Sequence, residues 1–264
     1  MKGSSVEKKK DKRRRTSTPS KYVPSNKKGY GWLWGLLVVI VVAAIVAVGI
    51  YMGVKSNRDS ENGADIAIKH SSVKVTENYI EFRSNNAKKD AKIIELFEDP
   101  RCPGCSELEK MHGAELADAI QSDQVVLRLR LMDFLNSQGA SQYSTRANAA
   151  LITVALTGDA ESAFRFHSIL WHTAPAEGGG VPEPTNAELA EKAKMAGAKG
   201  ETLSQIKSGN FGTMRAATMG RVNLKVLNER MDGKGGTPAA FMNGGQIDLS
   251  RPDWVTSLYT TNKK

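Results

Sequence analysis

The stretch "FEDPRCPGCSELEKMHG", Phe97–Gly113, contains both cysteines of this 264-residue chain. Cys102 and Cys105 are two residues apart, and the residues after them have the composition of a helix. The preceding segment "AKIIELF" is typical of a buried strand. A C-x-x-C pair at a strand-to-helix turn is a fairly specific sign of redox chemistry. The rest of the chain is interpreted outward from this turn.

The start of a helix favours a negatively charged sulfur. Its backbone N–H groups are unpaired and it carries a partial positive charge. Both stabilise a thiolate, which is the form of cysteine that attacks disulfides. Pro103 suits the first helical position, where its missing N–H costs nothing. We therefore predict that Cys102 attacks, and that Cys105, one turn further on, resolves the mixed disulfide.

Other uses of the cysteine pair fit less well. A structural bridge between positions so close together closes almost no loop and constrains the unfolded chain very little. A zinc site needs two more ligands, and only His112 is near, at an unfamiliar spacing. Haem attachment needs His where this chain has Ser106. We expect no metal and no cofactor other than the redox-active Cys102–Cys105 disulfide, with unused free thiols as the alternative.

Hydrophobic patterns on both sides of the turn predict an α/β fold. The predicted strands are a hairpin-like pair in residues 72–82, then 91–97, 125–134 and two short strands within 237–249. The predicted helices are 102–120, 141–156, 159–171, 185–197, 214–230 and 251–259. A strand, helix, strand unit around the cysteines is thus followed by a block of helices before strands return.

The helix after the cysteines is predicted to be amphipathic. Its buried face is predicted from apolar residues at helical spacing: Leu108, Met111, Leu116 and Ile120. The charged residues predicted to lie off this face are Glu107, Glu109 and Lys110.

The N-terminal segment joins a basic tail to an apolar stretch. Residues 1–28 carry eleven Lys and Arg against two acidic residues, a net +9 that equals the charge of the whole chain. The remainder sums to zero, so nucleic-acid binding loses its main support. Residues 32–54 carry no charge and would form roughly 34 Å of helix, enough to cross a hydrocarbon core of about 30 Å. Because basic residues stay on the cytoplasmic side, we predict a single-pass cell-membrane protein with an extracytoplasmic C-terminal domain.

The apolar stretch has three alternative interpretations. Lipoprotein processing would need a cysteine at the end of the apolar run, and there is none. A cleaved secretory signal usually has a shorter apolar region and a small-residue cleavage site, and "YMGVKSNRDS" offers no convincing one. A buried core helix would be shorter and would rarely lack charge over this length. The predicted boundaries are a basic disordered cytoplasmic tail (1–30), a transmembrane helix (31–54), a linker (55–69) and a domain (70–260) with helices inserted at about 138–230.

A second motif appears late in the chain. In "GKGGTPAAF", Gly233–Phe241, Pro238 opens a strand, where proline is tolerated and where a cis bond would be a deliberate feature. With the "CPGC" helix start and the inserted helices, this motif resembles the disulfide-bond oxidoreductase A (DsbA) family of the thioredoxin superfamily. The resemblance covers about residues 70–260, and it is greatest to membrane-anchored extracytoplasmic members of Gram-positive and actinobacterial type. It implies a thioredoxin-like fold with an inserted helical domain.

The resemblance assigns roles to individual residues. In the family the first cysteine attacks, the second resolves, and a cis-proline loop lies against the disulfide and offers backbone groups to the substrate. These roles fall on Cys102, Cys105, and Thr237 with Pro238. "FEDPRC" resembles the family's F-x-D-x-x-C. The supporting residues implied by the motifs are Pro103, Gly104, Phe97, Asp99 and Glu98.

Two positions depart from the family pattern. Gly104 stands where strongly oxidising members have His, so we predict a Cys102 pKa of roughly 4.5 to 6.5, between about 3.5 for the extreme oxidant and about 7 for thioredoxin. Leu96 stands where an acidic residue is often found. Glu95 and Glu98 lie close to it, each a candidate proton relay or an ordinary solvated carboxylate, and we favour the latter for Glu95. No role is assigned to the four histidines, His70, His112, His167 and His172.

The resemblance implies an extracytoplasmic thiol–disulfide oxidoreductase. Oxidation of exported proteins with cysteines is the expected direction, because that compartment is oxidising. A membrane redox partner would re-oxidise the pair. The alternatives are a reductase or isomerase, or a non-catalytic binding or metal-delivery module on a thioredoxin scaffold.

Overall fold

The computed structural model describes residues 62–138, 141–175 and 182–259. The predicted cytoplasmic tail and transmembrane helix lie outside these residues, as do residues 55–61 of the predicted linker. Among the helices within the described ranges, none is long and apolar enough to cross a membrane.

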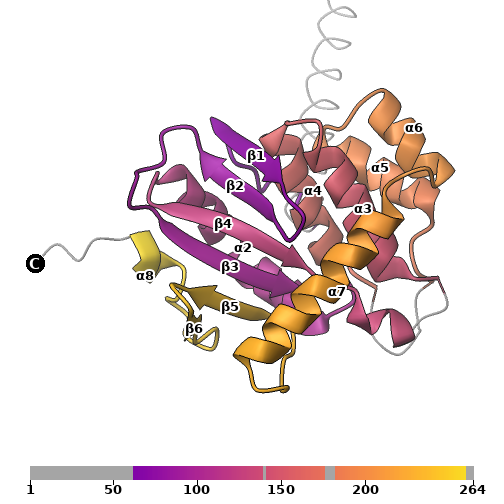
Figure 1. The fold of residues 1–264 in the computed structure, drawn as a ribbon. Coiled ribbons are helices and arrows are strands. Elements are labelled where there is room, and N and C mark those ends of the chain that lie inside the picture. The colour runs from indigo at the N-terminus through magenta and orange to yellow at the C-terminus, as the bar shows by residue number, and fades with distance from the viewer. Residues whose placement is uncertain (1–61, 139–140, 176–181, 260–264) are drawn as a thin grey trace, which may run out of the picture. The chain divides into compact units, whose positions relative to one another are not determined.

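A mixed sheet forms the centre of the fold (Figure 1). Its strands, in spatial order, are β1 (Ser71–Val75), β2 (Ile80–Ser84), β4 (Val125–Leu131), β3 (Lys92–Glu98), β5 (Ala239–Met242) and β6 (Gly245–Ile247). β3 and β4 are parallel, and the other neighbouring pairs are antiparallel. Both predicted hairpins are confirmed, and the second turns at Asn243 and Gly244, which have φ values of 52° and 82°.

β4 ends three residues earlier than predicted. A short 3-10 helix, η1 (Phe134–Gln138), follows it instead of a longer strand. The backbone N–H of Leu135 donates a hydrogen bond to the side chain of Asp99, at 3.1 Å. This bond gives the backbone a partner outside the sheet, so the apolar pattern of 125–134 overstated the strand.

Helices cover both faces of the sheet. α2 (Pro103–Gln121) packs against β2 and β4, while α7 (Thr213–Arg230) packs against β4 from the other side, and Figure 1 shows α7 crossing in front of the sheet. Between β4 and β5 the chain also forms α3 (Tyr143–Ala155), α4 (Ala160–His172), α5 (Asn186–Ala196) and α6 (Glu201–Ser208). A short last helix, α8 (Thr256–Tyr259), packs on α2. The predicted α/β class is confirmed.

The helix signals in the sequence were of unequal strength. α5 begins with the predicted capping box between Thr185 and Glu188, and it ends at Gly197, which has a φ of 113°. α6 was not predicted. It is only eight residues long, with Ile206 as its one buried residue, and it packs against α5.

The predicted buried face of α2 is confirmed at Leu108, Leu116 and Ile120 and wrong at Met111 and Glu109. Met111 is 63% exposed and Glu109 is only 1% exposed. The face follows Cys105 at helical spacing, through Glu109, His112 and Leu116. Because Cys105 is buried against the sheet, the residue four positions later is buried with it, whatever its polarity.

We predict that Phe82→Ala will destabilise the fold strongly. Phe82 on β2 is fully buried and meets Phe164 of α4 edge to face, with ring centroids 5.3 Å apart. Its truncation should lower the free energy of unfolding by about 3–5 kcal/mol, measured by denaturant titration. Met214→Ala, at a side chain that is 83% exposed, is the control and should change it by less than about 0.5 kcal/mol. Equal effects of the two changes would contradict the described packing.

Candidate active site

The turn between β3 and α2 presents the first cysteine. Cys102 is the N-cap residue of α2, with φ −76° and ψ 116°, and Pro103 occupies the first turn. The backbone N–H of Cys105 points at the Cys102 sulfur, at 3.3 Å. Both cysteines are free thiols in the structure. The predicted placement of a sulfur at a helix N-terminus is therefore present.

The late proline motif lies against this sulfur. The Thr237–Pro238 peptide bond is cis, and the Cys102 thiol donates a hydrogen bond to the Thr237 carbonyl, at 3.1 Å. A Cβ placed on Gly104 would lie 3.0 Å from Cδ of Pro238. The absence of a side chain at Gly104 thus allows the proline loop to approach the start of α2 closely.

Hydrogen bonds lower the pKa of Cys102 from 9.0 to about 7. The Cys105 side chain makes the largest contribution, the Thr237 side chain and the Cys105 backbone N–H add to it, and burial and the charge of Asp99 oppose it. This value lies above the predicted range of 4.5 to 6.5. The prediction counted the helix N-terminus but not burial, since Cys102 is only 5% exposed.

The second cysteine has the opposite character. Cys105 is fully buried, and burial raises its pKa well above 9.0. The hydrogen bond to Cys102 and the negative charge of Glu98 raise it further. At neutral pH Cys102 is thus able to ionise, while Cys105 holds its proton.

Asp99 ties the cysteine turn to the inserted helices. Its carboxylate accepts hydrogen bonds from the backbone N–H groups of Arg101 and Leu135 and from the Ser144 hydroxyl of α3, at 3.0, 3.1 and 2.6 Å. Burial raises the pKa of Asp99 to about 6, against the effect of these bonds. Asp99 therefore fixes the position of the turn from three sides.

The other aromatic and acidic candidates divide between the two faces of β3. Phe97 packs edge to face against Phe241 on the α7 side, with ring centroids 5.7 Å apart. Glu95 lies on the same side and is paired with Arg130 and Arg230. Burial alone would raise the pKa of Glu95. The hydrogen bonds from the two arginines outweigh this effect, so the pKa of Glu95 is lowered. The interpretation of Glu95 as a solvated carboxylate was wrong, because an Arg on β4 and one on α7 cover it.

Glu98 lies at the end of β3 and is 1% exposed. Its Oε2 is 2.8 Å from Nε2 of His167, on the inserted helix α4. Glu109 of α2 is also buried, with Oε2 3.9 Å from Nδ1 of the same imidazole. No role was predicted for His167 or Glu109. The sequence shows that Glu109 is four residues after Cys105, which places both on one helix face. It does not show that α4 brings His167 to this face, because that is a tertiary contact.

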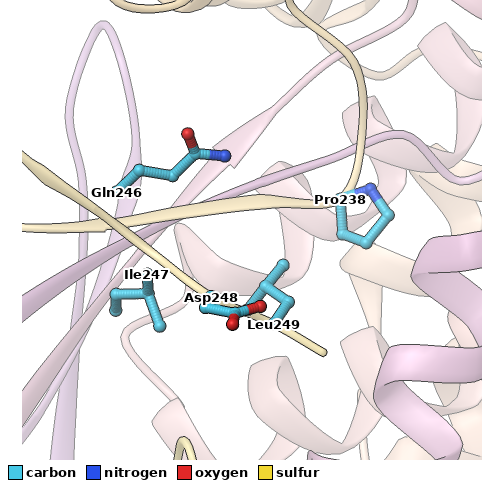
Figure 2. A pocket seen from close by; sticks show the side chains of 5 residues that line it. All are labelled: Pro238, Gln246, Ile247, Asp248 and Leu249. Atoms are coloured by element: carbon cyan, nitrogen blue, oxygen red, sulfur yellow. The ribbon is translucent and has the colours of Figure 1, made fainter. Parts of the chain in front are cut away.

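A groove begins at the proline loop (Figure 2). It has a volume of about 380 Å³ and is lined by Pro238, Gln246, Ile247, Asp248 and Leu249. Its far wall is the chain of β6 and the residues after it, and β6 is an edge strand of the described sheet. The groove thus shares Pro238 with the cysteine site. In the part of the chain that the structure describes, no group of His, Cys, Asp or Glu could hold a metal ion.

Comparisons with known proteins agree with this arrangement. Residues 86–258 match the family described as Thioredoxin. The structure is similar to the MdbA protein of Corynebacterium diphtheriae, described as a thiol-disulfide oxidoreductase, with a TM-score of 0.65 and 28% identity over 74% of this chain and 96% of that one. DsbA of Mycobacterium tuberculosis shares the fold, with a TM-score of 0.58 and 23% identity over 70% of this chain and 94% of that one.

A further match is to part of a longer curated protein. The serine/threonine-protein kinase PknE of Mycobacterium tuberculosis is 31% identical over 172 residues, which are 62% of this chain but 29% of the relative. The chain therefore spans less than a third of that relative's length. The chain belongs to the thioredoxin family. Within it, the fold is DsbA-like.

We predict that Gly104→His will lower the pKa of Cys102 below about 7, because a positively charged or hydrogen-bonding imidazole would stabilise the thiolate. Titration of the thiolate absorbance in the reduced protein measures the change. Gly104→Ala is the matched control, since it adds the Cβ near Pro238 without the imidazole. An equal shift in both variants would assign the effect to displacement of the proline loop.

Proposed function

We propose that this chain is an extracytoplasmic thiol–disulfide oxidoreductase that oxidises the thiols of exported proteins through Cys102 and Cys105. The observation that carries the proposal is the contrast between the cysteines. Cys102 lies at a helix N-terminus beside a cis-proline loop, and its pKa is lowered. Cys105 is buried, and its pKa is raised. The similarity to the MdbA protein, described as a thiol-disulfide oxidoreductase, supports the same activity.

The reaction follows from this contrast. A substrate thiolate attacks the Cys102 sulfur of the disulfide, the bond to Cys105 breaks, and Cys105 leaves with the electron pair and takes up a proton. A second substrate thiolate then attacks the substrate sulfur of the mixed disulfide, and Cys102 leaves as a stabilised thiolate. The substrate dithiol is oxidised to a disulfide while the Cys102–Cys105 pair is reduced. Glu98, whose charge acts on Cys105, is the nearest candidate to exchange the proton.

The groove beside Pro238 suits an extended substrate segment. Thr237 offers its backbone next to the Cys102 sulfur, and the exposed edge of β6 forms the opposite wall. Extended peptides commonly bind by main-chain hydrogen bonds along such edges. A segment held there would bring its cysteine to Cys102 without a deep side-chain pocket, which fits an enzyme that acts on many sequences.

The reverse direction is the second candidate. A pKa of about 7 for Cys102 is close to that of thioredoxin, about 7, and far from that of the strongest oxidant, about 3.5. Weaker stabilisation of the thiolate gives a less oxidising disulfide, which favours a reductase or isomerase. Location supports oxidation, because thiols outside the cytoplasm tend to be oxidised. Insulin reduction and oxidative refolding of a reduced protein separate the two activities.

Membrane anchoring is supported by the sequence. The uncharged residues 32–54, after eleven basic residues, fit a signal-anchor helix with the domain outside. A membrane redox partner that accepts electrons from the reduced pair completes the cycle in this proposal. Without one, each chain would oxidise one substrate dithiol to a disulfide and stop.

We predict opposite outcomes for the two cysteine variants. Cys102→Ser should lose oxidative refolding activity to the uncatalysed rate, because the attacked sulfur is missing. Cys105→Ser should retain an attacking thiolate that nothing within the chain can release, so mixed disulfides with substrates should accumulate. Non-reducing electrophoresis with mass spectrometry identifies the trapped species.

Met111→Ser, at an exposed position on the same helix, is the control for this pair and should behave like the wild type. Trapped species with Cys102→Ser instead of Cys105→Ser would reverse the assigned roles. Unchanged refolding and insulin-reduction rates in both cysteine variants would favour a non-catalytic binding module.

We predict that the folded domain lies outside the cell. Protease added to intact cells should degrade residues after the apolar stretch and spare the basic tail, which an epitope tag at each end would report. A cytoplasmic protein under the same treatment controls for lysis. Full protection of the domain in intact cells would refute the proposed topology.

A further inference from the structure

Three titratable side chains are buried together behind Cys105. Glu98 of β3 and Glu109 of α2 are each 1% exposed, and His167 of α4 is fully buried. The imidazole lies between the two carboxylates, with Nε2 at 2.8 Å from Glu98 and Nδ1 at 3.9 Å from Glu109. Charged groups buried in this way are costly unless they are paired and hydrogen-bonded.

The surroundings hold this cluster in place without completing its hydrogen bonds. The ring of Trp171 lies over His167, with centroids 4.4 Å apart. Among the described residues, Oε1 of Glu98 and Nδ1 of His167 have no hydrogen-bond partner. A Cβ on Gly113 would lie 2.5 Å from Oε1 of Glu109, so a glycine inside α2 leaves room for this carboxyl group.

Cys105 needs a proton source that solvent does not supply directly. When Cys105 leaves the disulfide it is a thiolate in a fully buried site, where burial raises its pKa well above 9.0. Glu98 is the member of the cluster whose charge acts on Cys105. His167 connects Glu98 to Glu109 through its two ring nitrogens. Glu109 also lies one helical turn after Cys105 on the same buried face of α2, so the cluster lies next to the cysteine.

We propose that His167 and Glu109 form a buried proton store that serves Cys105 through Glu98. This inference rests on the proposed thiol–disulfide exchange. In the oxidising direction a substrate thiolate bonds to Cys102, the S–S bond breaks, and the store protonates the departing Cys105 thiolate. In the reducing direction the Cys105 thiol returns its proton to the store before its sulfur attacks. His167 and Glu109 touch neither substrate nor sulfur, so they are positioning and proton-holding residues.

The charges around the store allow it to release a proton near neutral pH. Burial raises the pKa of Glu109 to about 7, although the charge of His167 opposes this. Burial alone would lower the pKa of His167. The charges of Glu109 and Glu98 outweigh this effect, so the pKa of His167 is raised. The other titratable groups that act on the cluster are Cys105 on α2 and His172 on α4. As pH rises above about 7, the store should lose its proton.

The experiment measures one turnover of the full chain against pH. The oxidised protein is mixed with an excess of a reduced two-cysteine peptide, quenched with acid and alkylated, and the free Cys105 thiol is measured by mass spectrometry. His167→Gln should slow its appearance by about 10- to 100-fold below pH 7, within or below the usual contribution of a general acid. The wild-type to variant ratio should fall as pH rises, because the wild-type store also loses its proton. Glu109→Gln should act in the same direction.

The protein contains a matched control pair. His112 and Glu115, both on α2, are also 2.8 Å apart but lie outside the cluster. His112→Gln and Glu115→Gln should leave the rate within about twofold of the wild type at every pH, since neither is on the path to Cys105. If His167→Gln lowers the thermal unfolding midpoint, Glu109→Gln carries the test, because it keeps the side-chain volume.

The outcomes distinguish this inference from the proposed function. A wild-type protein that does not react with the peptide overturns both. A reactive wild type, with folded His167→Gln and Glu109→Gln variants whose rates match it across pH, overturns the proton store alone. A uniform slowing that does not depend on pH also overturns it, because a purely structural role would give that result.

Discussion

The pairing of β3 with two neighbours is the constraint on which the site depends. β3 runs parallel to β4, so α2 must carry the chain back between them, and the cysteines fall at its start. β5 runs antiparallel to β3, with Ala239 opposite Phe97. Pro238 therefore enters the sheet at the end from which β3 leaves toward Cys102. Segments 135 residues apart in sequence meet there, in the hydrogen bond from Cys102 to Thr237.

Burial then separates two chemically identical side chains. Cys102 faces the proline loop and accepts hydrogen bonds that stabilise its thiolate. Cys105 lies one helical turn deeper, where the loss of water outweighs the one hydrogen bond, with the Asp99 backbone, that lowers its pKa. This difference favours Cys102 over Cys105 as the sulfur that forms the mixed disulfide with the substrate. It also creates a requirement, because a buried leaving group cannot collect its proton from solvent. Glu98, Glu109 and His167 lie behind Cys105, where that proton is needed.

Local features of the site could be predicted from the sequence, and tertiary features could not. The C-x-x-C spacing, Pro103 and the strand before them carry their signal within a few residues, and so does the capping box of α5. The burial of Glu109 against a helix face that begins at Cys105 contradicts the polarity of glutamate, so periodicity missed it. The contact between His167 and Glu98 joins residues 69 positions apart, and no local pattern encodes it. The hydrogen bond from Cys102 to Thr237 likewise joins residues 135 positions apart, and no local pattern encodes it.

The inserted helices do more than cover the sheet. α3 supplies Ser144 to Asp99, which fixes the turn before Cys102, and α4 supplies His167 to Glu98, behind Cys105. Each cysteine is thus supported by a different inserted helix, through one of two adjacent acidic residues, Glu98 at the end of β3 and Asp99 directly after it. A thioredoxin-like core without this block would keep the cysteines, the helix start and the proline loop. It would lack the side chains that hold Asp99 in place and that bridge Glu98 to Glu109. The insertion is therefore part of the chemistry of the site, and substitutions within it should alter redox behaviour even where they lie far from Cys102 in sequence.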